Sequence, residues 1–121
     1  MSLDWFPFKI GLYLKNTLHL TTRQHGGYLL LILAAVENDG MLPSNDVALA
    51  AISKLDAKAW REDGDVLKAF LVREGDWWLH EYARFVAREA AELIAKKSKA
   101  GKEGAAKRWR GRRRDSEEVV Q

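Results

Sequence analysis

A dense run of cations near the C-terminus is the feature of this sequence best suited to chemistry. Residues 96–114 contain ten Lys and Arg and one acid, a local charge of +9. The other residues contain ten Lys and Arg against sixteen Asp and Glu, a charge of −6. Such segregation is typical of proteins that bind a polyanion. We therefore expect nucleic-acid contacts from Lys96, Lys97, Lys99, Lys102, Lys107, Arg108, Trp109, Arg110, Arg112, Arg113 and Arg114.

In the functional interpretation these cations track phosphates, and each contact releases a counterion, so that affinity falls as salt rises. Trp109 could then stack on an unpaired base or lie against a groove wall. The alternative is a solubilising linker whose Trp packs on nothing. Membrane binding is disfavoured, because the run lacks a sustained apolar face. The density of like charge favours nucleic acid.

The histidines and carboxylates do not form a catalytic or metal-binding pattern. His19, His25 and His80 lack the paired spacing of a metal site, and the sequence has no cysteine. We expect structural roles for them, such as bonding near Trp5 or Tyr13 or packing at a helix start. The sequence shows no Gly-rich phosphate loop and no Ser nucleophile signature. It therefore predicts no enzymatic activity and no cofactor.

Length and composition favour one compact cytoplasmic domain. The chain has 121 residues, 47% of them hydrophobic. The first ten residues do not resemble a signal peptide. The longest apolar run, Tyr28–Val36, has nine residues, whereas a membrane span needs about twenty. We expect no membrane association.

Two helices are expected in the first third of the chain. Residues 9–16 read as a short helix or turn. Thr21 and Gln24 have capping-box spacing, so a second helix should run from Thr21 to about Asn38. The paired glycines 26–27 suggest that another element approaches this helix closely, and the segment 5–8 is a candidate.

Two more helices and a hairpin should follow. Ser44 or Asn45 can cap a third helix, with a packing face made of Val47, Leu49 and Ile52. Asp56 can cap a fourth, over about 57–71, although Gly64 weakens it. Residues 70–80 hold two β-capable runs around Glu74-Gly75-Asp76, which predicts a hairpin with one ring of Trp77-Trp78 inward and the other outward.

A long helix over 81–97 completes the folded part. Gly101, Gly104 and Gly111 should break any helix beyond it. The sequence thus predicts a mainly α fold with a small β-hairpin, similar to a winged helix-turn-helix. Residues 4–97 would form this domain, and 98–121 a basic, flexible C-terminal arm. The fourth helix is a second candidate surface through Lys54, Lys58, Arg61 and Lys68, but acids lie among them, and no base contacts are assigned.

Several motifs together resemble the YdaU-like family of phage and prophage proteins. They are Trp5-Phe6-Pro7 with Tyr13, then Thr17-Leu18-His19-Leu20, then His25-Gly26-Gly27-Tyr28 with its run of leucines, and the closing segment Lys97 to Trp109. The resemblance implies a prophage origin, a winged-helix-like fold and a context similar to the N-terminal part of phage replication-initiation proteins. It supplies no catalytic residues. This sequence departs from the family at Leu12, where an acidic residue usually precedes the tyrosine, and at Gln24, where glutamate is usual.

Two functions of different kind follow. The first is a non-enzymatic DNA-binding domain of a replication-initiation-like protein, with affinity mainly from the basic arm and little sequence selectivity. The second is an adaptor that binds phage or host replication proteins through the face around Trp77 or Trp78, with the tail as an accessory anchor. Binding of single-stranded nucleic acid or RNA by the same arm is a third interpretation.

Overall fold

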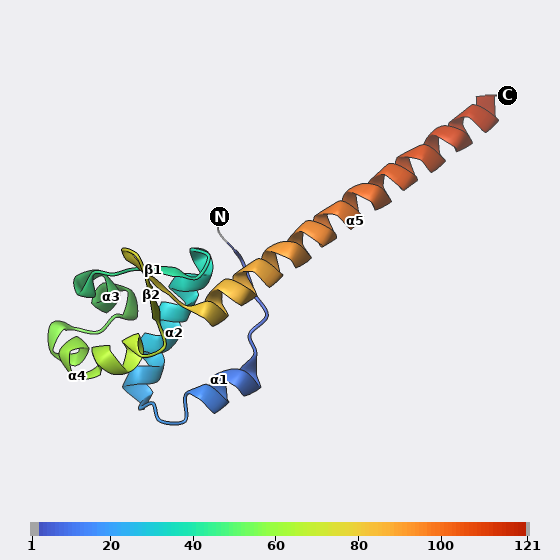
Figure 1. Cartoon of the computed structure of the whole chain (residues 1–121). Coiled ribbons are helices and arrows are strands. Elements are labelled where there is room, and N and C mark those ends of the chain that lie inside the picture. Colours follow the sequence, from blue (N-terminus) through green and yellow to red (C-terminus); the bar gives the residue numbers. More distant parts are fainter. Residues whose placement is uncertain (1–2, 121) are drawn as a thin grey trace. The chain divides into compact units, whose positions relative to one another are not determined.

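The fold is described from a computed structural model, which covers the backbone of residues 3–120 and the side chains of residues 3–104. The chain divides into two units, residues 1–90 and 91–121, which are described separately. In chain order the elements are α1 (Ile10–Asn16), α2 (Thr22–Glu37), β1 (Met41–Pro43), α3 (Asp46–Ser53), α4 (Ala57–Lys68), β2 (Val72–Glu74), β3 (Trp77–Leu79) and α5 (Glu81–Val120) (Figure 1).

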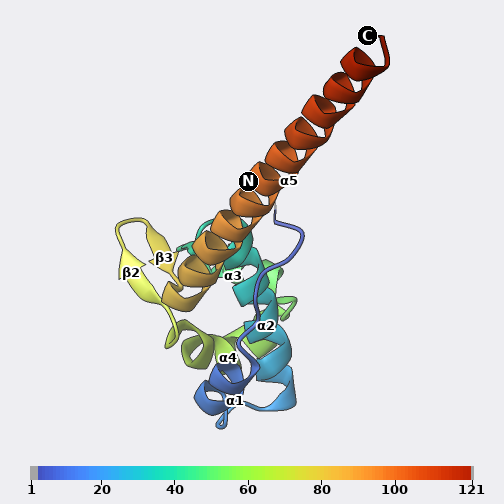
Figure 2. The same ribbon diagram turned by 90° about the vertical axis from the view of Figure 1, so that its right-hand side faces the viewer.

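A small antiparallel sheet accompanies the helices of the first unit. β2 and β3 form the expected hairpin (Figure 2), which confirms a mainly α fold with a small β-hairpin. β1 was not expected, and it pairs with β3 to give the strand order β1-β3-β2. Leu42 lies opposite Trp78 in this pairing and is fully buried. The third strand therefore ties the hairpin to the hydrophobic core.

The helix α2 lies at the centre of the core, as its apolar sequence predicts. Leu31, Ile32 and Ala35 are almost completely buried on it. The predicted capping box is present: the Gln24 backbone N–H donates to the Thr21 hydroxyl, and the Thr21 N–H donates to the Gln24 side chain at 2.9 Å. Both side chains satisfy amides that a helix start otherwise leaves without partners.

The helices α3 and α4 begin at the predicted caps. Asn45 accepts a hydrogen bond from the Val47 N–H, and Asp56 accepts one from the Ala59 N–H, both at 2.8 Å. The predicted packing face of α3 is wrong at Val47, whose side chain is 78% exposed. Capping explains this, because Val47 lies in the first turn next to the cap, while the helix buries Leu49 two residues later.

Two helical glycines mark close contacts inside the first unit. The helix α4 is continuous through Gly64. A Cβ at this position would stand 3.0 Å from the ring of Trp60, which lies one turn earlier in the same helix. A Cβ on Gly27 would meet Leu67 at 3.2 Å, whereas Gly26 faces open space. The element that approaches α2 here is therefore α4 together with its neighbours, and the expectation of the segment 5–8 was wrong.

The last helix is longer than predicted. It was expected to end near Lys97 and to be broken by Gly101, Gly104 and Gly111, but α5 continues to Val120. A helical glycine costs only about 1 kcal/mol relative to alanine, and most residues around these three are Ala, Lys, Arg and Glu, which favour helices. That 98–121 forms a separate flexible arm stays a prediction. None of the described helices is long and apolar enough to span a membrane.

Candidate nucleic-acid interface

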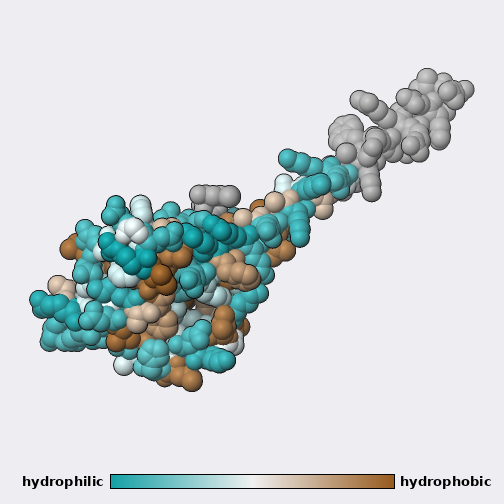
Figure 3. Space-filling view, in the orientation of Figure 1, coloured by the Kyte–Doolittle hydropathy of each residue, from teal (hydrophilic) through white to brown (hydrophobic). Residues whose placement is uncertain are grey.

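The basic segment, which we define as residues 96–114, lies entirely within α5. Lys96, Lys97, Lys99 and Lys102 are exposed. None of these four forms an ion pair with a carboxylate among the described side chains. Their ammonium groups are therefore available to an external anion. Hydrophilic residues dominate this stretch of the helix in the face that Figure 3 shows.

The other predicted contact residues occupy the C-terminal part of the same helix. Their side chains lie outside the described residues, so only their positions on the backbone are known: Lys107, Arg108, Trp109, Arg110, Arg112, Arg113 and Arg114. An α-helix turns by 3.6 residues, so the four described lysines, Lys96, Lys97, Lys99 and Lys102, are spread around the helix axis and do not share one face.

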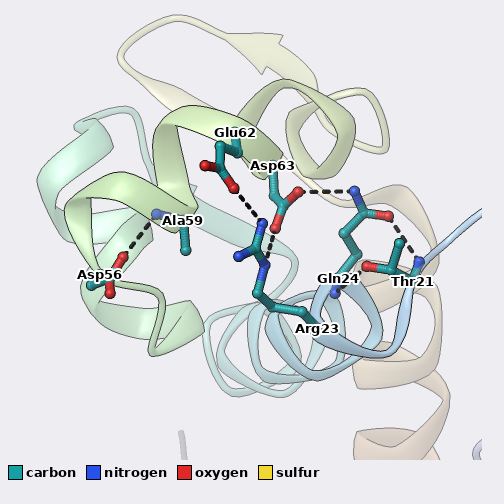
Figure 4. Close-up of polar contacts among 7 residues, drawn as sticks. All are labelled: Thr21, Arg23, Gln24, Asp56, Ala59, Glu62 and Asp63. Carbon is teal, nitrogen blue, oxygen red and sulfur yellow. Dashed lines mark hydrogen bonds and ion pairs between the residues drawn. The ribbon is translucent and has the colours of Figure 1, made fainter.

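A polar network holds α4 against the start of α2 (Figure 4). The Arg23 Nε donates to Asp63 at 2.6 Å, and its Nη2 donates to Glu62 at 2.8 Å. The Gln24 amide, besides capping α2, donates to the second oxygen of Asp63 at 3.0 Å. The hydrogen bond from Arg23 lowers the pKa of Asp63 below its usual value, more than the opposing effect of burial raises it. Asp63 is therefore a buried, structural carboxylate.

The same network explains why Gln24 can stand where the family usually has an acid. The amide side chain supplies an acceptor to the cap and a donor to Asp63, whereas a carboxylate could only accept. Sequence reasoning found the cap but not the second contact, because Asp63 is far away in the chain. A carboxylate at position 24 is thus not needed for this packing.

The three histidines are dispersed and serve packing. The His25 Nδ1 lies 2.9 Å from the Tyr13 hydroxyl, while His19 stacks on Phe70. His80 is buried, and its Nδ1 accepts a hydrogen bond from the Ala83 N–H in the first turn of α5. These positions confirm structural roles near Tyr13 and at a helix start.

His80 joins two helices through its two ring nitrogens. Because its Nδ1 accepts from the backbone, the ring proton is on Nε2, which donates to the Tyr28 hydroxyl at 2.8 Å. Burial lowers the pKa of His80 to about 4. The imidazole is therefore neutral near pH 7, and it caps α5 while joining that helix to α2.

The tryptophans of the hairpin divide as alternation predicts. The Trp78 ring is partly buried against the core, and the Arg73 guanidinium lies 5.4 Å from its centroid. The Trp77 ring is 45% exposed, and Val72 on the edge strand β2 is 49% exposed. Glu74 at the end of β2 and Asp76 in the turn that follows it are both exposed. This outer face combines apolar and acidic groups, so it suits a protein partner better than phosphate.

Comparison with known proteins agrees with the motifs found in the sequence. Residues 4–90 match the family model described as "Protein of unknown function (DUF1376)". The chain belongs to this family. It is 32% identical over 101 residues to the "Uncharacterized protein YdaU" of Escherichia coli (strain K12). That alignment covers 84% of this chain and 35% of the relative, so the chain spans about a third of that protein's length.

The family model ends at residue 90, before the basic segment begins, whereas the alignment with the Escherichia coli relative covers 101 residues of this chain and therefore extends into that segment. No solved structure matches the chain significantly. Membership in the YdaU-like family is therefore established, and neither of the two names states an activity.

Proposed function

We propose that this protein is a non-enzymatic DNA-binding protein of winged-helix type that acts in the initiation of prophage replication. The basic segment supplies most of its affinity. The observation that carries the proposal is the exposure of Lys96, Lys97, Lys99 and Lys102 on one helix with no described carboxylate paired to them. Such unpaired cations gain most from phosphates, because binding releases the condensed counterions of the nucleic acid.

The order of elements supports the winged-helix part of the proposal. A helix, a strand, two helices, a hairpin and a further helix follow one another from α2 to α5. A short turn joins α3 to α4, as in helix-turn-helix proteins, and the hairpin β2–β3 would be the wing. The role in replication rests on the resemblance to replication-initiation proteins.

Duplex binding by the full chain tests the proposal. We expect the variant K96Q/K97Q/K99Q/K102Q to bind duplex DNA more weakly than the natural chain at about 0.1 M salt. Its slope of log K against log salt should be shallower by about 0.9 for each phosphate that the variant no longer neutralises. Substitution of Lys15, an exposed lysine of α1, is the matched control and should leave the slope unchanged. The proposal fails if the natural chain does not bind duplex even near 50 mM salt.

Single-stranded DNA and RNA are alternative ligands of the same segment. Trp109 could stack on an unpaired base, which favours single strands, whereas phosphate contacts alone favour the higher charge density of a duplex. Competition between duplex DNA and single-stranded RNA for the labelled complex decides between them. We expect the duplex to compete better.

An adaptor function is the second candidate, and the exposed face of the hairpin favours it. Trp77 and Val72 expose apolar area beside Glu74 and Asp76, and aromatic residues are enriched at protein interfaces. In this alternative the basic segment only anchors the complex. If the natural chain does not bind DNA, or binds it with an affinity that does not depend on salt, the adaptor function becomes the leading hypothesis.

A further inference from the structure

The turn between α3 and α4 carries cations that the acids of the first unit leave unpaired. Lys54 closes α3 in a left-handed conformation, φ 62°, and its side chain is exposed. Lys58 and Arg61 are exposed on α4, three residues apart and therefore on one face. Within the described part of the chain, none of the three forms an ion pair.

The acids at the cap and in the middle of α4 are engaged by other groups. The Asp56 carboxylate accepts the Ala59 N–H as the helix cap. Glu62 and Asp63 share the Arg23 guanidinium, which approaches from α2 (Figure 4). Mixed signs in the sequence of α4 argue against an anion-binding surface, but the fold pairs these acids with an arginine from a different helix.

The acid in the second half of α4 is also paired. Lys68 lies 3.6 Å from Asp65 and 3.2 Å from Asp46 of α3. The pairing separates Lys68 from the other cations of α4, because it holds this lysine near α3. The first half of α4 is thus the part of this helix whose exposed cations have no acidic partner.

A shallow pocket lies beside these cations. It is lined by Arg23, Lys54, Leu55, Asp56, Lys58, Ala59 and Glu62. The lining carries three cations and two carboxylates, so its formal net charge is +1. An anionic group of phosphate size would meet Lys54 and Lys58 there.

We propose that Lys54, Lys58 and Arg61 form a second phosphate-binding surface for duplex DNA, located on the folded first unit and additional to the basic segment. This inference rests on the proposed function. Contacts of this kind fix the orientation of a protein on the duplex without reading its sequence. The surface would therefore fix the orientation of the first unit on the duplex.

The test compares duplex binding by full-length variants at several salt concentrations. We expect K54Q/K58Q/R61Q to bind more weakly than the natural chain, with a slope of log K against log salt shallower by roughly 2 to 3. The slope of K58Q should be shallower by about 0.9, and that of K15Q, which removes the same charge from α1, should not change. All three variants should unfold at the same denaturant concentration as the natural chain, since these side chains are exposed and unpaired.

Two results overturn the inference: a triple variant with the natural slope, or a K15Q variant whose slope changes as much as that of K58Q. In both cases the proposed function survives if the natural chain binds duplex DNA and the K96Q/K97Q/K99Q/K102Q variant binds it more weakly. If the natural chain itself does not bind, the proposed function fails, and the second surface fails with it.

Discussion

Acidification should destabilise the first unit through His80. In the folded chain the pKa of this imidazole is about 4, because burial disfavours the charged ring, whereas an ordinary histidine titrates at 6.5. The unfolded chain therefore takes up the proton first as pH falls. The stabilisation is fully present above pH 6.5 and is lost progressively as pH falls to about 4. This difference in pKa corresponds to roughly 3 kcal/mol of unfolding free energy.

The hydrogen bonds explain why the folded state resists protonation. A proton on Nδ1 would point at the Ala83 N–H, which that nitrogen now accepts at 3.0 Å, and the first turn of α5 would lose its cap. Urea unfolding, followed by tryptophan fluorescence between pH 7.5 and 4, measures the effect. Asp63 acts in a more acidic range: its lowered pKa contributes stability above the ordinary value of 3.8, and this contribution is lost as pH falls below that value.

The variant H80N isolates the contribution of the ring. Asparagine is a good helix cap, so it can still accept the Ala83 N–H, but it does not titrate. We expect H80N to be less stable near pH 7, because it loses the bond to Tyr28, and to lose little further stability between pH 6.5 and 4. An H80N profile as steep as the natural one would refute the reasoning.

Three further predictions concern stability. G64A should lower the unfolding free energy by about 1 to 3 kcal/mol, because the added methyl meets the Trp60 indole ring. G26A should raise it by up to about 1 kcal/mol, because its methyl faces open space. Equal effects of the two variants in urea unfolding would contradict this prediction. Q24E should lower the unfolding free energy by about 1 to 3 kcal/mol at pH 7, because it removes the hydrogen-bond donor to Asp63, and by less below pH 4. A Q24E variant as stable as the natural chain at pH 7 would count against this contact. Burial raises the pKa of Tyr28, so stability should fall as pH rises above 10, and Y28F should remove that alkaline loss.

Local signals in the sequence were sufficient for the helix starts. Thr21 with Gln24, Asn45 and Asp56 are caps whose partners lie two or three residues away. The hairpin was predicted for the same reason, since Gly75 in a positive-φ turn is a local requirement. The basic segment was also found from sequence alone, because it depends on charge density and not on folding.

Features that depend on distant partners were not found. The strand β1 has three residues, and only its pairing with β3 makes it a strand. The contacts of Arg23 with Glu62 and Asp63 join residues about forty positions apart, and without them α4 seemed too acidic for phosphate. The extension of α5 was not predicted, because each glycine was treated as a helix break. The free-energy cost of one glycine in a helix is small compared with the summed helix preference of the neighbouring residues.

The salt dependence of duplex binding tests the central claim most directly. Isotherms would be measured for the natural chain and for a chain with all ten Lys and Arg of residues 96–114 replaced by Gln. We predict a linear fall of log K with log salt for the natural chain and the disappearance of most of that slope in the substituted chain. Equal slopes for the two chains would show that the cations of α5 do not carry the binding.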